Sequence, residues 1–310
     1  MSIAFVFPGQ GAQTIGMGRA LADAYPASRA VFEEVDEALG EPLSALIWEG
    51  DQDTLILTQN AQPALMATSI AAIRALEAEG VGIDSAAYVA GHSLGEYSAL
   101  CAAGVFSVAD TARLLRTRGQ AMQEAVPVGV GAMAAVLGLD FAAVAEVAAE
   151  AAQGEVCQAA NDNDPGQVVV SGHKAAVERA CEIAKGRGAK RAMLLPVSAP
   201  FHCAMMEPAA AVMKEALAGV DMKAPAVTVV PNVRAAGESD PAVLRGLLVD
   251  QVTGAVRWRE SVAWMAGNGV TEIWEIGAGK ALSGMIRRID REVATRAVGT
   301  PDDVVAARDA

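Results

Sequence analysis

Residues 86–103 read AAYVAGHSLGEYSALCAA and place one serine between two elements of secondary structure. The short apolar run of residues 86–90 predicts a buried strand, and residues 94–103 predict a helix that follows directly. Between them, Gly91–Gly95 match the G-x-S-x-G pattern, in which a sharp strand-to-helix turn exposes the serine hydroxyl. We therefore predict that Ser93 is a nucleophile rather than part of a structural turn. The helix start supplies the free backbone amide of Leu94, which is well placed to stabilise an oxyanion.

Outward from this turn, short apolar runs alternate with amphipathic stretches. Residues 3–7, 227–231 and 272–276 predict further strands, and residues 16–38, 61–79, 108–125 and 280–289 predict helices. Ser107, followed three residues later by Asp110, is typical of a helix start. The alternation predicts an α/β domain with parallel strands and helices on both faces of the sheet.

A change of composition at residues 126–131 marks the start of a second unit. Strands are predicted at residues 132–139, 156–161, 167–171 and 189–196, with helices at 141–152 and 174–185 and a turn at 162–166. This βαββαβ order is ferredoxin-like. We predict a small domain of residues 126–196, inserted into a large domain formed by residues 1–125 and 197–310.

The bulk composition excludes several classes of protein. Of 310 residues, 53% are hydrophobic and 20% are charged, which is typical of a well-packed globular protein. No apolar run is long enough to cross a bilayer and the first residues lack a signal-peptide pattern, so we expect a cytoplasmic protein without membrane contact. A net charge of −13 disfavours nucleic-acid binding. Four scattered cysteines and three histidines do not predict a metal site.

A nucleophilic serine needs a base, and the chain offers three histidines. His92 adjoins Ser93, where the sharp turn points neighbouring side chains in different directions. His173 lies at the start of a predicted surface helix in the small domain. His202 lies in a loop that leaves a strand and returns to the large domain, which makes it the leading candidate.

The group that would orient His202 is less distinct in the sequence. Asp250 and Glu275 are candidates, but each is equally typical of a solvated charge. A backbone carbonyl could accept the imidazole N–H and fix the tautomer in place of an acid. The sequence leaves these alternatives open.

One arginine lies on the apolar side of the helix predicted at residues 108–125. Arg118 falls three or four positions from each member of its apolar stripe. The members of that stripe are Leu114, Leu115, Ala121 and Met122. An inward cation is costly unless an anion meets it, so Arg118 either pairs with an internal carboxylate, extends to solvent, or awaits a ligand. Beside an acyl-serine site, its planar fork suits an acyl group with a free acid end.

Six segments together resemble the malonyl-CoA:acyl carrier protein transacylases, in the same order along nearly the whole chain. They are residues 7–13 (FPGQGAQ), 91–97 (GHSLGEY), 118–119 (RG), 161–163 (NDN), 198–202 (SAPFH) and 275–280 (EIGAGK). The resemblance implies a large α/β-hydrolase-like domain and a small ferredoxin-like domain, with the active site between them.

The resemblance also implies roles for individual residues. Ser93 would be the acylated nucleophile and His202 the general base and acid. Arg118 would pair with the malonyl carboxylate, and the backbone amides of Gln10 and Leu94 would form the oxyanion hole. The main-chain carbonyl of Gln251 would orient His202 in place of an acid.

The implied reaction passes malonyl from coenzyme A to a serine and then to the phosphopantetheine thiol of acyl carrier protein, for fatty-acid biosynthesis. It needs no cofactor. An acidic carrier would require local positive charge on this acidic enzyme. Lys185, Arg187, Lys190 and Arg191 form a run without an acid, and Arg287 with Arg288 adds two charges. We expect docking at Lys190, Arg191, Arg287 and Arg288, although a solvated face explains them equally well.

Three other classes of protein share parts of this sequence pattern. A serine hydrolase has the same turn and passes the acyl group to water; the inward Arg118 and the inserted domain favour a transferase. A catalytically silent carrier-binding module would not be labelled at Ser93. A nucleotide-binding loop at Gly9-Gln10-Gly11 lacks the third glycine, since position 14 is threonine.

Overall fold

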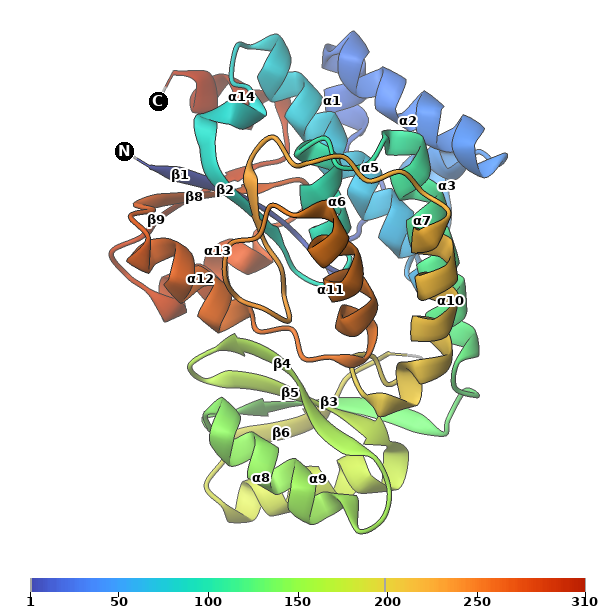
Figure 1. Cartoon of the computed structure of the whole chain (residues 1–310), viewed down its shortest axis with the longest axis vertical. Helices are drawn as coiled ribbons and strands as arrows, with labels where there is room; N and C mark the ends of the chain where they lie inside the picture. The colour runs from blue at the N-terminus through green and yellow to red at the C-terminus, as the bar shows by residue number, and fades with distance from the viewer. Residues whose placement is uncertain (1, 198, 310) are drawn as a thin grey trace.

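The computed structural model describes residues 2–197 and 199–309, and within them two separate sheets organise the chain. The larger sheet has five parallel strands in the order β7-β2-β1-β8-β9. Its strands are β1 (Ile3–Phe7), β2 (Ala86–Gly91), β7 (Thr228–Val230), β8 (Glu272–Ile276) and β9 (Ala294–Val298). Figure 1 shows this sheet in the upper part of the molecule, with helices on both sides. The α/β class predicted from the alternation is confirmed.

Strand β1 explains why both faces of the large sheet are covered. Phe5 and Phe7 pack into one apolar cluster, whereas Ala4 and Val6 pack into another on the opposite face. Successive side chains of a strand point to opposite faces, so a continuous apolar run requires helices on both. The helices of this domain are α1 (Arg19–Ala24), α2 (Pro26–Leu39), α3 (Leu43–Glu49), α4 (Gln52–Leu55), α5 (Thr58–Ala78), α6 (Gly95–Ala102), α7 (Val108–Glu124), α10 (Glu207–Ala218), α11 (Pro241–Thr253), α12 (Trp258–Gly267), α13 (Ala281–Ile289) and α14 (Pro301–Arg308).

Helix starts follow local chemistry. Ser107 caps α7 as predicted, its side chain accepting a hydrogen bond from the backbone amide of Asp110. The single helix predicted at residues 16–38 is wrong, because α1 ends before Tyr25 and α2 begins with Pro26 at its first position. Proline has no amide to continue a helix but suits a helix start.

The smaller sheet is antiparallel, in the order β4-β5-β3-β6. Its elements are β3 (Gly131–Leu137), α8 (Phe141–Ala152), β4 (Cys157–Asp164), β5 (Gln167–His173), α9 (Lys174–Gly186) and β6 (Arg191–Leu194). This arrangement confirms the ferredoxin-like prediction. The domain limits at residues 126 and 196 stay a prediction. Of the segment quoted as SAPFH, Ser198 lies outside the described residues.

The turn predicted at residues 162–166 is too long. Strand β4 continues to Asp164, and only Pro165 and Gly166 separate it from β5. Aspartates are typical of turns, but Asp162 and Asp164 are buried in the strand and paired with Arg259 and Arg288. Long-range ion pairs therefore override the local turn preference.

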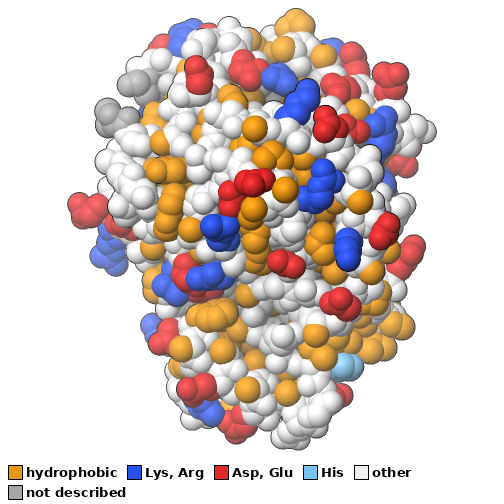
Figure 2. All heavy atoms as spheres, viewed as in Figure 1, with side chains coloured by type: hydrophobic (Ala, Val, Ile, Leu, Met, Phe, Trp, Pro, Cys, Tyr) orange, Lys and Arg blue, Asp and Glu red, His pale blue; other side chains and the backbone are white. Residues whose placement is uncertain are grey.

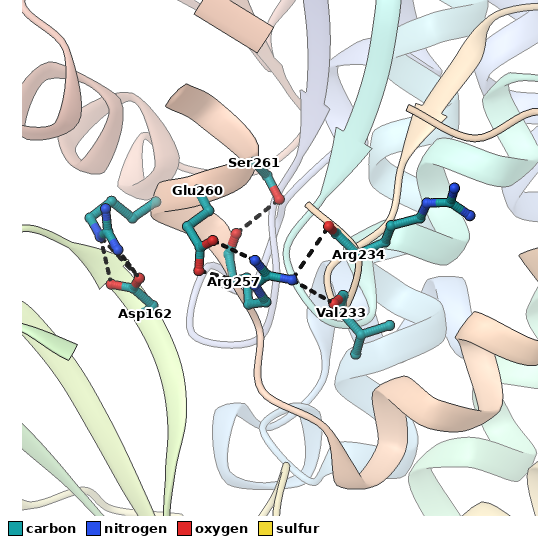
Figure 3. Close-up of polar contacts among 7 residues, drawn as sticks. Asp162, Val233, Arg234, Arg257, Glu260 and Ser261 are labelled. Carbon is teal, nitrogen blue, oxygen red and sulfur yellow. Dashed lines mark hydrogen bonds and ion pairs between the residues drawn. The ribbon is translucent and has the colours of Figure 1, made fainter. Parts of the chain in front are cut away.

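The two sheets meet where β4 approaches the segment before α12. The backbone amide of Val256 donates to the carbonyl of Ala160 at 2.8 Å, and the amide of Asp162 donates to Val256 at 2.9 Å. Figure 3 shows Asp162 facing an arginine of the α12 segment, which is Arg259 at 2.8 Å. Figure 1 shows β4 nearest the large domain and α8 and α9 on the far side of the small sheet.

Arg257, which precedes α12, links this segment to the rest of the large domain through hydrogen bonds. Its guanidinium donates to the carbonyl oxygens of Val233 and Arg234 and to Glu260, and Ser261 donates to its carbonyl (Figure 3). The small sheet therefore contacts a segment of the large domain that the hydrogen bonds of Arg257 stabilise. No helix in the described ranges is long and apolar enough to cross a membrane.

Candidate active site

Ser93 lies in the turn between β2 and α6, with a backbone φ of 54°. A Cβ atom on Gly91 would lie 2.0 Å from the carbonyl oxygen of Gly95, and one on Gly95 would lie 2.2 Å from the carbonyl oxygen of Phe7. Neither position accommodates a side chain. The two glycines of the motif are therefore needed for the turn itself.

His202 lies directly against this serine. Its Nε2 is 2.8 Å from Ser93 Oγ, and its Nδ1 is 2.9 Å from the carbonyl oxygen of Gln251. A carbonyl only accepts hydrogen bonds, so Nδ1 carries the proton and Nε2 is free to accept one from Ser93. Burial lowers the pKa of His202 to about 3, with a further contribution from the Arg118 cation. The imidazole is therefore neutral at neutral pH.

Neither acidic candidate orients His202. Asp250 is exposed. Glu275 is fully buried and accepts hydrogen bonds from the amides of Leu282 and Ser283 at the start of α13, at 3.0 and 2.7 Å. The interpretation of Glu275 as a solvated charge is wrong, because it caps a helix. The carbonyl of Gln251 occupies the place that an acid would take.

Arg118 is buried on the apolar side of α7, with 1% of its surface exposed. It donates to Gln62 Oε1 at 2.7 Å, to Gln251 Oε1 at 2.9 Å and to Ser93 Oγ at 3.1 Å. No carboxylate forms an ion pair with it within residues 2–197 and 199–309. The internal ion pair and the extension to solvent are thus both excluded, and a desolvated cation with neutral partners lies beside the serine.

Close helix packing brings Arg118 to this position. A Cβ on Gly119 would lie 2.5 Å from the backbone of Gln59, so glycine allows α7 to approach α5 closely. The guanidinium carbon also lies 5.6 Å from the ring centre of Tyr97. Burial lowers the pKa of Arg118, and Tyr97 and Glu96 oppose this shift. A cation held mostly by neutral groups favours an incoming anion.

The backbone amides of Gln10 and Leu94 lie beyond two neighbouring strands. Phe7 of β1 pairs with Gly91 of β2. Gln10 lies three positions after Phe7, and Leu94 lies three positions after Gly91. In the part of the chain that the structure describes, neither amide donates a hydrogen bond. Two free donors that follow neighbouring strands at one edge of the sheet, one of them next to the serine in the chain, can stabilise an oxyanion.

The other two histidines contact different groups. His92 Nε2 lies 2.9 Å from Asn163 Oδ1 of the small domain, and its ring packs against Trp258. His173 Nδ1 accepts from the amide of Val156 at 3.0 Å. Of the three histidines, only His202 has a ring nitrogen hydrogen-bonded to Ser93 Oγ.

Three polar residues of the site were not predicted. Asn232 Oδ1 accepts from the Ser93 amide at 2.8 Å, and its Nδ2 donates to the Gly91 carbonyl at 2.6 Å. Gln62 and Glu96 are buried in helices that are otherwise almost wholly buried. A polar residue inside an apolar helix was the available signal for both, and nothing in the sequence singles out Asn232.

The basic residues proposed for docking differ in how free their charges are. Lys190 and Arg191 are exposed, with no ion pair among the described residues. Arg287 donates to Thr295 Oγ1, whereas Arg288 pairs with buried Asp164 at 2.7 Å.

The run from residue 185 to residue 191 contains no acidic residue in the sequence, but acidic side chains outside it form ion pairs with two of its basic residues. Lys185 pairs with Glu182 at 2.7 Å, and Arg187 pairs with Glu146 at 3.0 Å. On the face seen in Figure 2, acidic and basic side chains are likewise interspersed. Of this run, only Lys190 and Arg191 form no ion pair with another residue that the structure describes.

The described residues offer no resident metal centre. No group of three or more histidine, cysteine or acidic side chains in the described ranges could hold a metal ion. Cys101, Cys157, Cys181 and Cys203 are buried and free.

Comparison with known proteins matches this geometry to one family. The family model of the acyl transferase domain matches residues 4–278. Malonyl CoA-acyl carrier protein transacylases of Bacillus subtilis and Escherichia coli are each 47% identical, over 97% and 98% of this chain and 95% and 98% of their own. The acyl-carrier-protein S-malonyltransferase of Bartonella henselae superposes with a TM-score of 0.97 at 56% identity, covering 99% of this chain and 98% of its own. A malonyl-transacylase solved with its type II PKS acyl-carrier protein gives 0.96 at 42% identity, over 100% and 99%.

Proposed function

Since this chain belongs to the acyl transferase family and, within it, to the malonyl CoA-acyl carrier protein transacylases, we propose that it moves malonyl from coenzyme A to acyl carrier protein through a malonyl-Ser93 intermediate. One observation carries the proposal. The oxygen of Ser93 lies within hydrogen-bond distance of both the imidazole of His202 and the guanidinium of Arg118. A nucleophile, a base and a site for an acid group therefore converge on one atom.

In the first half-reaction, Ser93 Oγ attacks the thioester carbonyl of malonyl-CoA while His202 Nε2 accepts the hydroxyl proton. The carbonyl oxygen becomes an oxyanion, which the backbone amides of Gln10 and Leu94 stabilise. The C–S bond then breaks, and the coenzyme A thiolate leaves with the proton from His202. The carbonyl of Gln251 accepts from Nδ1 of His202, which keeps the neutral imidazole in the required tautomer and keeps the imidazolium in the same orientation.

The second half-reaction runs the same steps with a new thiol. The phosphopantetheine thiol of the carrier gives its proton to His202 and attacks the malonyl-serine ester. The oxyanion again forms at the amides of Gln10 and Leu94. When the C–O bond breaks, His202 returns the proton to Ser93. The product is malonyl-carrier thioester, the extender used in fatty-acid biosynthesis, and the free enzyme is regenerated without a cofactor.

Arg118 supplies the preference for an acyl group with a free acid. Its guanidinium is desolvated and lacks an anionic partner in the described residues. A malonyl carboxylate would supply that anionic partner. Charge-assisted pairs of this kind are about twice as strong as neutral hydrogen bonds. An acetyl group would leave the cation unpaired.

Carrier docking is proposed at the basic residues nearest the edge of the small domain and on α13. Lys190 and Arg191 are the strongest candidates because both are exposed and unpaired among the described residues. Arg287 is a further candidate, and Arg288 contributes less because Asp164 offsets its charge. The reaction is assigned to the cytoplasm, which is supported by four buried free thiols typical of a reducing compartment.

Intact-mass spectrometry tests the proposal directly. The wild-type chain, mixed with malonyl-CoA, should gain the mass of one malonyl group, and peptide mapping should place it on Ser93. Addition of carrier protein with its phosphopantetheine arm should remove that mass and transfer it to the carrier. Release of free malonate at the same rate without a carrier would instead indicate a hydrolase.

A further inference from the structure

Glu96 is a buried acid that the proposed reaction does not use. It is the second residue of α6, three positions after Ser93, and none of its surface is exposed. Its Oε2 accepts hydrogen bonds from the backbone amide of Asn232 at 2.9 Å and from Nε2 of Gln251 at 2.8 Å. Its Oε1 has no partner among the described residues. One oxygen therefore joins two segments that both reach the serine.

The first of these segments holds the strained turn. The side chain of Asn232 accepts from the amide of Ser93 at 2.8 Å and donates to the carbonyl of Gly91 at 2.6 Å, so it spans the turn. A non-glycine residue at φ 54° persists only where its surroundings hold it there. Glu96 fixes the backbone from which this bridging side chain extends.

The second segment holds the base and the cation. The carbonyl of Gln251 accepts from His202 Nδ1 at 2.9 Å, and its Oε1 accepts from Arg118 at 2.9 Å. Its Nε2 is shared between Glu96 and the carbonyl of Ser93, at 2.8 and 3.0 Å. The side-chain amide of Gln251 therefore contacts Arg118 and the Ser93 backbone directly, with Glu96 as its buried acceptor, and it anchors the residue whose main-chain carbonyl orients His202.

From this geometry we infer that Glu96 is a positioning residue for acyl transfer, which fixes the Ser93 turn through Asn232 and fixes His202 and Arg118 through Gln251. The inference rests on the proposed function. Glu96 touches neither Ser93 Oγ nor His202 in the structure, so it acts through its two neighbours.

The role requires reach and an acceptor oxygen rather than a charge. Burial raises the pKa of Glu96 to about 7, opposed by hydrogen bonds from Asn232 and Gln251 and by the Arg118 cation. Both protonation states keep Oε2 as an acceptor. Glutamine has the same length and the same acceptor, and its amide nitrogen would take the place of Oε1, which has no hydrogen-bond partner among the described residues. Aspartate keeps the charge but is one methylene shorter.

Four variants separate these requirements. Glu96→Ala and Glu96→Asp should lower the first-turnover acylation rate by roughly 100-fold, the cost of about 1 Å of misplacement in an active site. Both malonyl-CoA and acetyl-CoA should be affected, because the serine and its base are shared. Glu96→Gln should stay within about 10-fold of wild type. Glu275→Gln is the control for the loss of a buried carboxylate elsewhere: it loses one acceptor at the start of α13, which should lower stability, but the rate of the folded protein should be unchanged.

Each rate is measured on protein shown to be folded by near-ultraviolet circular dichroism, and the wild type is run alongside. If Glu96→Ala does not fold, the order of Glu96→Asp and Glu96→Gln still decides. An active Asp variant with an inactive Gln variant would overturn the inference, because charge would then matter rather than reach. Folded Glu96 variants that all acylate at the wild-type rate would also overturn it. A wild type that gains no malonyl mass would refute the proposed function instead.

Discussion

Ser93 and His202, whose Oγ and Nε2 atoms lie 2.8 Å apart, both have a positive backbone φ, 54° and 59°. Such backbone angles are unfavourable for residues with a side chain and cluster where the surrounding structure over-determines them. Ser93 is fixed by Asn232, and His202 is fixed by the carbonyl of Gln251. The unfavourable backbone angles of both Ser93 and His202 are therefore maintained by contacts with residues far away in the chain. These contacts keep the Ser93–His202 hydrogen bond in place before substrate binds.

Removal of the serine and removal of the histidine should impair acylation to different degrees. Ser93→Ala should abolish the covalent malonyl-enzyme, because it removes the hydroxyl that His202 and Arg118 both contact. His202→Ala should slow its formation by about 10²–10⁴-fold, the usual contribution of a general base. Intact-mass spectrometry with malonyl-CoA measures both. His173→Ala is the control histidine; malonyl mass on Ser93→Ala would show that the nucleophile is another residue.

The acylation rate should remain high at lower pH than it would with a histidine base of ordinary pKa. Burial holds the pKa of His202 at about 3, well below its ordinary value, so the base stays neutral as the pH falls from 7 to 5. First-turnover rates from pH 4 to pH 8 test this, with circular dichroism as a check on folding. Glu96, with a pKa raised to about 7, also titrates in this range, so the profile should be repeated in Glu96→Gln. A half-maximal rate near pH 6.5 in both proteins would contradict the prediction.

The same burial predicts how stability depends on pH. The folded pKa of His202 lies below the unfolded value, so the unfolded chain binds this proton first as the pH falls. The contribution of His202 is present above pH 6.5 and is lost between about 6.5 and 3. Urea unfolding at several pH values should therefore show a shallower loss on acidification in His202→Gln than in the wild type. Equal slopes would show that His202 is not held neutral.

The ion pair between the domains should stabilise the joined structure. Arg259→Ala removes the partner of Asp162, whose side chain is 1% exposed, while that of Arg259 is 36% exposed. Because the arginine is partly solvated, we expect a loss of about 1–3 kcal/mol in the free energy of unfolding, less than for a fully buried pair. Arg287→Ala is the control in urea unfolding, because among the described residues its side chain donates one hydrogen bond, to Thr295.

The deficit of Arg259→Ala should shrink in acid. Burial already raises the pKa of Asp162, and loss of Arg259 raises it further. A group with a raised folded pKa is stabilising at low pH and costs stability as the pH rises through that value. The difference from wild type should be larger at pH 8 than at pH 5. A deficit that does not change with pH, or that matches Arg287→Ala, would mean that Asp162 does not need this partner.

How much the sequence predicts depends on the range of the interactions involved. The strand, turn and helix around Ser93 were predicted because glycines and apolar residues determine them locally. Arg118 was predicted because a cation on an apolar helix face conflicts with its neighbours. Strand β9 was missed, since residues 294–298 are partly exposed and include an arginine, which removes the apolar signal.

The rest of the site depends on contacts between distant segments. Asn232 lies 139 positions from Ser93, and Glu96 lies 136 positions from Asn232 along the chain. No local pattern marks a residue whose partners are brought to it only by the fold. The turn predicted at residues 162–166 failed for the same reason, because Asp162 and Asp164 pair with arginines about 100 positions away or more.

Charge reversal at the edge of the small domain tests carrier docking. Lys190→Glu with Arg191→Glu should raise KM for the carrier protein, more at low salt than at high salt, because exposed charges are screened. Acylation by malonyl-CoA should stay nearly unchanged. Lys214→Glu with Lys223→Glu is the matched control, since both lysines are exposed and the change in net charge is the same. Equal losses in the two double variants, or in both half-reactions, would count against docking at this edge.

Loss of Arg118 should lower the rate of malonyl transfer more than the rate of acetyl transfer. In Arg118→Ala a malonyl carboxylate enters the site without its partner, and an unpaired charge of this kind costs about 2–5 kcal/mol, or tens to thousands in rate. Acetyl makes no such demand. Its rate should nevertheless fall somewhat, because Arg118 also donates to Ser93 Oγ and to Gln251. The ratio of malonyl to acetyl transfer, rather than either rate alone, therefore reports on the carboxylate.

Arg118→Lys completes this test. Lysine restores the charge but not the planar fork, which in the structure reaches Gln62 with one nitrogen and Ser93 and Gln251 with the other. We expect the malonyl-to-acetyl ratio to recover only in part, between those of alanine and wild type. The rates are measured from malonyl-CoA and acetyl-CoA on folded variants. If both substrates fall by the same factor in Arg118→Ala, the arginine only holds its neighbours in place, and the carboxylate must be bound elsewhere.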